Sequence, residues 1–113
     1  MTTPQSPNSG PIGSELVRDD PSFGDIVLQF VDGLKDRLNS MENALRAADF
    51  EKLRVAAHQL KGSGGGYGYP VLTENAAVLE KHAKNQALND CAQTLNELQS
   101  ICSRVVVDTE STS

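Results

Sequence analysis

The chain has 113 residues, enough for one domain with a modest core and too few for a second catalytic domain. Its 15 acidic residues outnumber 10 lysines and arginines, and the formal net charge of -5 opposes nucleic-acid binding. No apolar run approaches the roughly 18 residues of a membrane span, and the N-terminus shows no secretory signal. We therefore expect a cytoplasmic monomer with neither nucleic acid nor a membrane as partner.

The composition predicts one helical domain between two tails. Residues 1–19 are rich in Pro, Ser, Gly and Thr and hold too few apolar side chains to offset the entropy of ordering, so a disordered N-terminal tail is expected there. Residues 108–113 are predicted to form a C-terminal tail. The domain then spans residues 20–107. Aromatic residues are only 4% of the chain and Trp is absent, which favours packed helices over a sheet.

Apolar residues recur at three- and four-residue steps in four segments, which predicts four helices. The first runs from Asp25 to Ala48 and contains Gly33, at a cost of up to ~1 kcal/mol relative to Ala. Asp49 is expected to end it and to cap the second helix. The four stripes are Ile26, Phe30, Leu34, Leu38, Met41 and Leu45; Leu53, Ala57, Leu60, Gly64 and Tyr67; Leu72, Ala76, Leu79 and Ala83; and Leu88, Cys91 or Ala92, Leu95, Leu98, Cys102 and Val105.

Short connections favour antiparallel neighbours, so the predicted fold is all-α, an antiparallel up-down-up-down four-helix bundle. Residues 105–107, three valines, are a possible strand, but a single strand has nothing to pair with. Cys91 and Cys102 lie near the last apolar stripe and are expected to be core residues rather than a disulfide.

One strip of the second helix gathers His58, Lys61, Gly62 and Gly65, because three- and four-residue steps return to the same side. The strip lies away from the apolar stripe, so His58 should be at least partly exposed. Glycines at positions 62, 64, 65 and 66 cost a helix roughly 2–4 kcal/mol relative to alanines. We interpret them as a bare surface on which another protein's backbone can approach His58.

The chemistry of these side chains suits phosphoryl transfer. A neutral imidazole nitrogen is nucleophilic near neutral pH, whereas a lysine amine is protonated and a serine needs a base. Lys61, one turn after His58, supplies a cation that can stabilise charge on transferred oxygens, and Ser63 offers a hydroxyl.

Residues 58–68, HQLKGSGGGYG, resemble the His-x-Leu-Lys-Gly-Ser signature of histidine phosphotransfer (Hpt) domains. The resemblance extends through Leu72, Ala76, Ala77 and Leu79-Glu80 on the next helix. It implies a phosphorelay in which His58 carries a phosphoryl group between receiver-domain aspartates, with Lys61 and Gly62 near it.

The resemblance also implies the partners and cofactors. They are response-regulator receiver domains and a hybrid histidine kinase, with no intrinsic cofactor or metal site and with magnesium bound by the receiver. Many members of the family place a glutamine or a similar polar residue on the facing helix near the histidine, and the matching position here is Glu80. A carboxylate there can orient one imidazole nitrogen, and it also repels a phosphoryl group that comes too close, so Glu80 is assigned a supporting role.

The sequence is also compatible with functions other than phosphotransfer. The main alternative is a docking bundle that binds receiver domains or other signalling partners without chemistry. A phosphatase acting through His58 needs a residue that activates water, and Glu80 is the only candidate in the sequence.

The glycine run does not indicate a nucleotide site, because it lacks the Gly-Lys-Ser/Thr ending of a P-loop and no strand precedes it. His58, His82, Glu80 and the cysteines lack the close spacing of a metal site. Arg54, one turn before His58, either contacts an acidic receiver or has no role.

Overall fold

The computed structural model describes residues 10–107; residues 1–9 and 108–113, both predicted to be tail, lie outside the described residues. The element order is α1 (Glu15–Asp19), a 3₁₀ helix η1 (Pro21–Phe23), α2 (Gly24–Asp32), α3 (Leu34–Arg46), α4 (Phe50–Gly66), α5 (Pro70–Lys84) and α6 (Leu88–Cys102). The all-helical prediction is confirmed, whereas the described part of the chain has more helices than the predicted four. No helix within residues 10–107 has the length and apolar character needed to cross a membrane.

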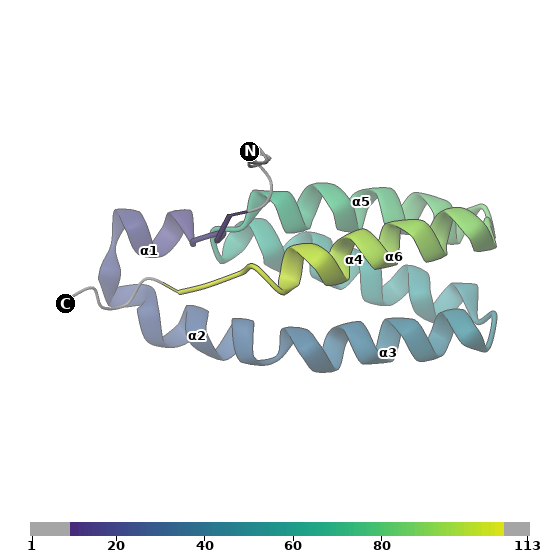
Figure 1. Ribbon diagram of the computed structural model, residues 1–113, viewed down its shortest axis with the longest axis horizontal. Helices are drawn as coiled ribbons and strands as arrows, with labels where there is room; N and C mark the ends of the chain where they lie inside the picture. Colours follow the sequence, from purple (N-terminus) through teal and green to yellow (C-terminus); the bar gives the residue numbers. More distant parts are fainter. Residues whose placement is uncertain (1–9, 108–113) are drawn as a thin grey trace, which may run out of the picture.

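The four longest helices pack around one core (Figure 1). Helix α3 contacts α4 and α6, and α5 contacts the same two helices, so the contacts form a closed ring. The largest of these contacts joins α4 to α5, the two helices on which the predicted site residues lie. The stripes predicted for α4 and α5 are buried at Leu53, Ala57, Leu60, Gly64, Leu72, Ala76, Leu79 and Ala83.

The stripe of α6 is confirmed only in part. Cys91 is buried among the core residues, whereas Leu88 at the first turn is 50% exposed. Cys102 is half-buried, and burial raises the pKa of its thiol to about 11. Both cysteines are free thiols, as expected for core residues.

The predicted helix from Asp25 to Ala48 is wrong in one respect, because it is divided at Gly33 into α2 and α3. Glycine is the residue of this segment with the weakest helix-forming tendency. The inward face of α2 also differs from the prediction: Val27 is fully buried, while Ile26 is 48% exposed. The two helices thus follow one another along the core with a break between them.

The predicted N-terminal tail extends too far, because residues 14–19 are ordered on the bundle. Ser14 caps α1 by accepting a hydrogen bond from the amide of Val17 at 3.1 Å, and both residues are buried. The Ser14 hydroxyl also donates to the carbonyl of Tyr67 at 2.7 Å. These long-range contacts offset the entropy of ordering, and composition alone gives no sign of them.

The turn between α4 and α5 is held by the segment that leads into α1, and Figure 1 shows the two side by side. The amide of Glu15 donates to the carbonyl of Gly68 at 2.8 Å. Gly68 has a φ of +92°, and a Cβ on it would collide with the backbone nitrogen of Leu16 and the hydroxyl of Ser14. Only glycine satisfies both demands at this position.

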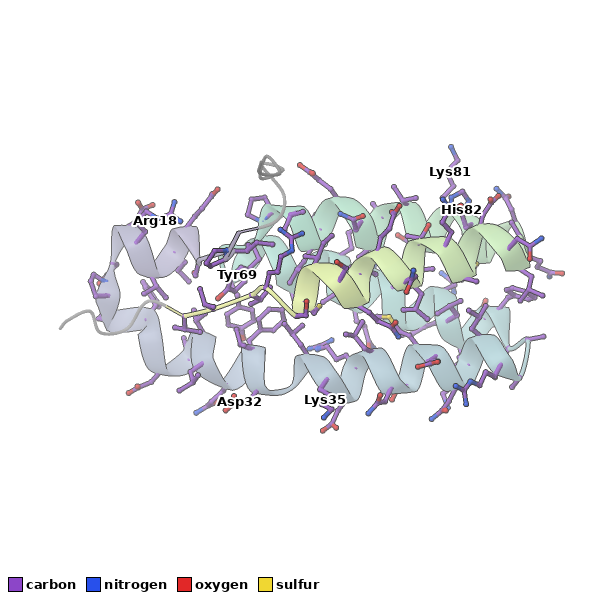
Figure 2. All side chains as sticks on the ribbon, viewed as in Figure 1. Arg18, Asp32, Lys35, Tyr69, Lys81 and His82 are labelled. Atoms are coloured by element: carbon purple, nitrogen blue, oxygen red, sulfur yellow. The ribbon has the colours of Figure 1, made fainter. Side chains whose placement is uncertain are left out.

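The C-terminal valines pair with the N-terminal segment. An isolated parallel bridge joins Ile12 to Val105, with hydrogen bonds of 2.8 Å from Ile12 to Arg104 and from Val106 to Ile12. The expectation that a strand here has no partner was therefore wrong, although the pairing is a single bridge. The fully buried Tyr69 donates its hydroxyl to the carbonyl of Val106 at 2.7 Å, and Figure 2 marks Tyr69 where these segments meet.

Replacing Gly68 by alanine should destabilise the protein. The positive φ and the collision with α1 should lower the free energy of unfolding by about 1–3 kcal/mol. Gly66→Ala is the matched control, because a Cβ there meets nothing within 4 Å and alanine favours a helix. Urea denaturation followed by circular dichroism measures both. Equal midpoints for the two variants would contradict the assigned role of Gly68.

Candidate functional site

His58 lies on the outward side of α4, next to the buried Ala57. The helix is fixed at its start by Asp49, whose carboxylate accepts from the amide of Lys52 at 3.1 Å, as the sequence predicts. The side chain of His58 is 63% exposed. A partner protein therefore has direct access to the imidazole ring.

Glu80 of α5 joins His58 and Lys61 of α4. Its Oε2 lies 3.0 Å from Nδ1 of His58, and its Oε1 lies 2.7 Å from Nζ of Lys61. The Glu80 side chain is only 15% exposed, far less than that of His58. The structure thus brings together three residues that the sequence singled out, around the carboxylate of one half-buried side chain.

This carboxylate determines which imidazole nitrogen is free. The hydrogen bond from Lys61 is the main cause that holds the pKa of Glu80 below its ordinary value, burial opposes it, and the hydrogen bond from His58 adds to the lowering. An ionised carboxylate only accepts hydrogen bonds, so Nδ1 of His58 must carry a proton and donate it. In a neutral imidazole, Nε2 then keeps its lone pair.

The glycines of α4 serve two purposes. A Cβ added to Gly62 would meet no atom within 4 Å, which fits the predicted bare surface beside His58. At Gly64, in contrast, a Cβ would lie 2.8 Å from Cβ of Leu72, and at Gly65 it would lie 3.1 Å from the hydroxyl of Thr73. These two glycines allow the close approach of α5, a reason that the sequence pattern does not reveal.

Ser63 and Arg54 were also candidates from the sequence. Ser63 is half-buried, and its carbonyl accepts from the amide of Tyr67 at 3.0 Å near the end of α4. The guanidinium of Arg54 bonds to Glu51 on its own helix, with Nε 3.0 Å from the carboxylate. Neither residue contacts His58 through a hydrogen bond of the described structure.

A surface hollow of about 310 Å³ borders Glu80 on the α5 side. Its lining residues are Lys61, Ala77, Glu80, Lys81, Lys84 and Asn85. Figure 2 shows the side chain of Lys81 extending outward from α5, beside His82. The lysines make this flank of the site locally basic in an acidic protein, which favours acidic groups on a partner.

His82 itself belongs to a different contact, with Nδ1 3.9 Å from a carboxylate oxygen of Asp90. Within residues 10–107, no group of three or more His, Cys, Asp and Glu side chains is arranged to hold a metal ion. The groups that the structure does bring together at His58 are an imidazole, a carboxylate and an ammonium group.

A titration of the Glu80 carboxyl carbon by NMR should give a pKa below the ordinary 4.5. Lys61→Met should raise this pKa more than His58→Ala does, because the lysine is the larger cause of the lowering. Since the native pKa is lowered, the contacts stabilise the fold above pH 4.5, and this contribution is lost as the pH falls through the native pKa. An unchanged pKa in Lys61→Met would contradict the assigned ion pair.

The comparisons agree with the resemblance seen in the sequence. Residues 25–107 match the family model described as the Hpt domain, a range that runs from α2 past the end of α6 and includes His58, Lys61 and Glu80. No curated protein and no solved structure matches the chain. Because the family model covers well over half of the sequence, the chain belongs to the Hpt domain family.

Proposed function

We propose that this protein carries a phosphoryl group on Nε2 of His58 between the aspartates of receiver domains. Membership of the Hpt family places the chain in histidine phosphotransfer within two-component phosphorelays. The observation that carries the assignment of His58 is its hydrogen bond to Glu80, which engages Nδ1 and leaves Nε2 free on an exposed ring.

In the transfer step, the lone pair of Nε2 attacks the phosphorus of an aspartyl phosphate on the receiver. A nitrogen–phosphorus bond forms while the bond from phosphorus to the aspartyl oxygen breaks, and the aspartate leaves as a carboxylate. The ring keeps the proton on Nδ1 and gains a positive charge, which the adjacent Glu80 carboxylate stabilises. The reverse reaction delivers the phosphoryl group to the aspartate of a second receiver.

Lys61 supplies the cation for this step. Its Nζ lies 2.7 Å from Glu80 and its side chain is about one-third exposed, so it can reach an incoming phosphoryl oxygen while it remains near the carboxylate. The ion pair compensates the negative charge of Glu80, which reduces the repulsion that a lone carboxylate would exert on the phosphoryl group. Gly62 leaves room beside the ring for the partner's backbone.

The proposed partners are response-regulator receiver domains and a hybrid histidine kinase, and the magnesium ion that completes charge stabilisation is bound by the receiver. The basic hollow beside Glu80 supports docking against an acidic receiver surface. We place the protein in the cytoplasm as a monomer. The ring of α3 to α6 supports an antiparallel up-down-up-down four-helix bundle, with α1 and α2 added at one end.

Phosphotransfer from a labelled, phosphorylated receiver domain tests the proposal. The wild type and His82→Ala should become labelled to the same extent, and the bound phosphate should be acid-labile and base-stable. His58→Ala should take up no label, because it lacks the nucleophilic nitrogen.

Two results would overturn the proposal. Labelling of His58→Ala would show that another residue accepts the phosphate. Binding of the receiver by the wild type without any labelling would favour the alternative, a docking bundle without chemistry.

A further inference from the structure

The hydroxyl of Thr73, on α5, contacts the backbone of α4 beyond His58. It donates a hydrogen bond to the carbonyl of Lys61 at 2.6 Å and accepts one from the amide of Gly65 at 2.7 Å. One hydroxyl can make both bonds, since it has one proton to donate and lone pairs that accept. Thr73 is half-buried, so its hydroxyl is partly shielded from competing water.

The two backbone groups bridged by Thr73 are four residues apart, and an α-helix pairs such groups with each other. A side chain that bonds to both groups competes with this pairing, and such competition loosens or bends a helix at that place. The bridge lies in the turn that begins at Lys61, directly after the turn that carries His58. It therefore acts on the part of α4 that sets the distance between the cation and the imidazole ring.

The glycines at this place make the bridge possible. A Cβ on Gly64 would lie 3.1 Å from the backbone nitrogen of Thr73, and a Cβ on Gly65 would lie 3.1 Å from its hydroxyl oxygen. Side chains at these two positions would crowd α5 and displace the hydroxyl. The glycines that lower the helix propensity of α4 thus provide the space in which the Thr73 hydroxyl of α5 contacts the backbone of α4.

Lys61 is consequently held by α5 at both ends. Its carbonyl bonds to Thr73, and its ammonium group bonds to Glu80, seven residues further along α5. Residues seven apart lie on the same face of a helix, so α5 presents both contacts to α4 together. Glu80 also bonds to His58. The contacts of α5 with the Lys61 carbonyl, the Lys61 ammonium group and the His58 ring are therefore positioned together by the packing of α5 on α4.

We propose that Thr73 is a positioning residue for phosphotransfer, which acts by holding the Lys61 turn of α4 in register with Glu80 and His58. The inference rests on the proposed function of His58. Thr73 touches neither the phosphoryl group nor the imidazole ring in this role. Its effect reaches the reaction through the placement of the lysine cation.

Thr73→Val tests the inference, because valine keeps the shape of threonine and removes the hydroxyl. The free carbonyl of Lys61 and the free amide of Gly65 can then pair with each other, so the fold should persist. The rate constant of transfer from a saturating phosphorylated receiver should fall about tenfold, with little change in receiver affinity. Thr73→Ser should restore the rate, and Thr94→Val on α6 should leave it unchanged.

A double-mutant cycle separates positioning from general destabilisation. If Thr73 acts through Lys61, Thr73→Val should have little further effect on the rate in a Lys61→Met background. A wild-type rate in Thr73→Val, or an equal loss in both backgrounds, would overturn the inference.

A readout without phosphotransfer keeps this inference distinct from the function of His58. In Thr73→Val the pKa of Glu80, measured by NMR, should rise toward its ordinary value as Lys61 moves away, and Thr73→Ser should reverse the rise. An unchanged pKa would overturn the inference even if the protein accepted no phosphate. A raised pKa in a protein that accepts none would support the positioning and refute only the proposed function.

Discussion

The close approach of α4 and α5 is the constraint on which the rest of the structure depends. At Gly64 the backbone of α4 comes so near to α5 that even a methyl group would collide with Leu72. This approach places Glu80 within hydrogen-bond distance of both His58 and Lys61. A wider separation of the helices would leave the imidazole free to rotate and the carboxylate without its cation.

Contacts at one end of the bundle fix this helix pair. The turn between α4 and α5 is bonded to the start of α1 through Ser14 and Gly68, and Tyr69 beside it is bonded to the C-terminal segment. Phe30 of α2 stacks on Tyr67, with ring centroids 4.6 Å apart. The first and last parts of the described chain thus hold the turn from which both site helices extend.

Sequence reasoning succeeded where the determining interactions are local. The apolar stripes of α4 and α5 are regular, and every predicted residue from Leu53 to Gly64 and from Leu72 to Ala83 is buried. It failed where distant contacts decide the structure. Helix α1 depends on hydrogen bonds from Ser14 to Tyr67 and from Glu15 to Gly68, each more than fifty positions away, and a local count of apolar residues does not include them.

The candidate site shows the same division. His58, Lys61 and Glu80 were found from a short motif and a family resemblance, but their mutual distances depend on how α5 packs on α4. For this reason the role predicted for Gly65 was incomplete. Its place on the outer strip of the helix suggested only the approach of a partner, whereas its missing Cβ also makes room for the hydroxyl of Thr73. The available signal for this contact was Thr73 itself, because threonine has only a modest helix propensity and still lies within a predicted helix. The spacing of residues did not indicate which groups its hydroxyl would contact.

A carboxylate at position 80 acts on His58 differently from the amide of a glutamine at the same place. A glutamine can turn either its oxygen or its amino group toward Nδ1, so it fits both tautomers of the ring. An ionised glutamate only accepts, and it therefore fixes the proton on Nδ1 and the lone pair on Nε2. The cost is a negative charge near an anionic group, and Lys61 offsets it at 2.7 Å. In this chain, the carboxylate and the lysine are consequently one functional unit, and the substitution of either changes the role of the other.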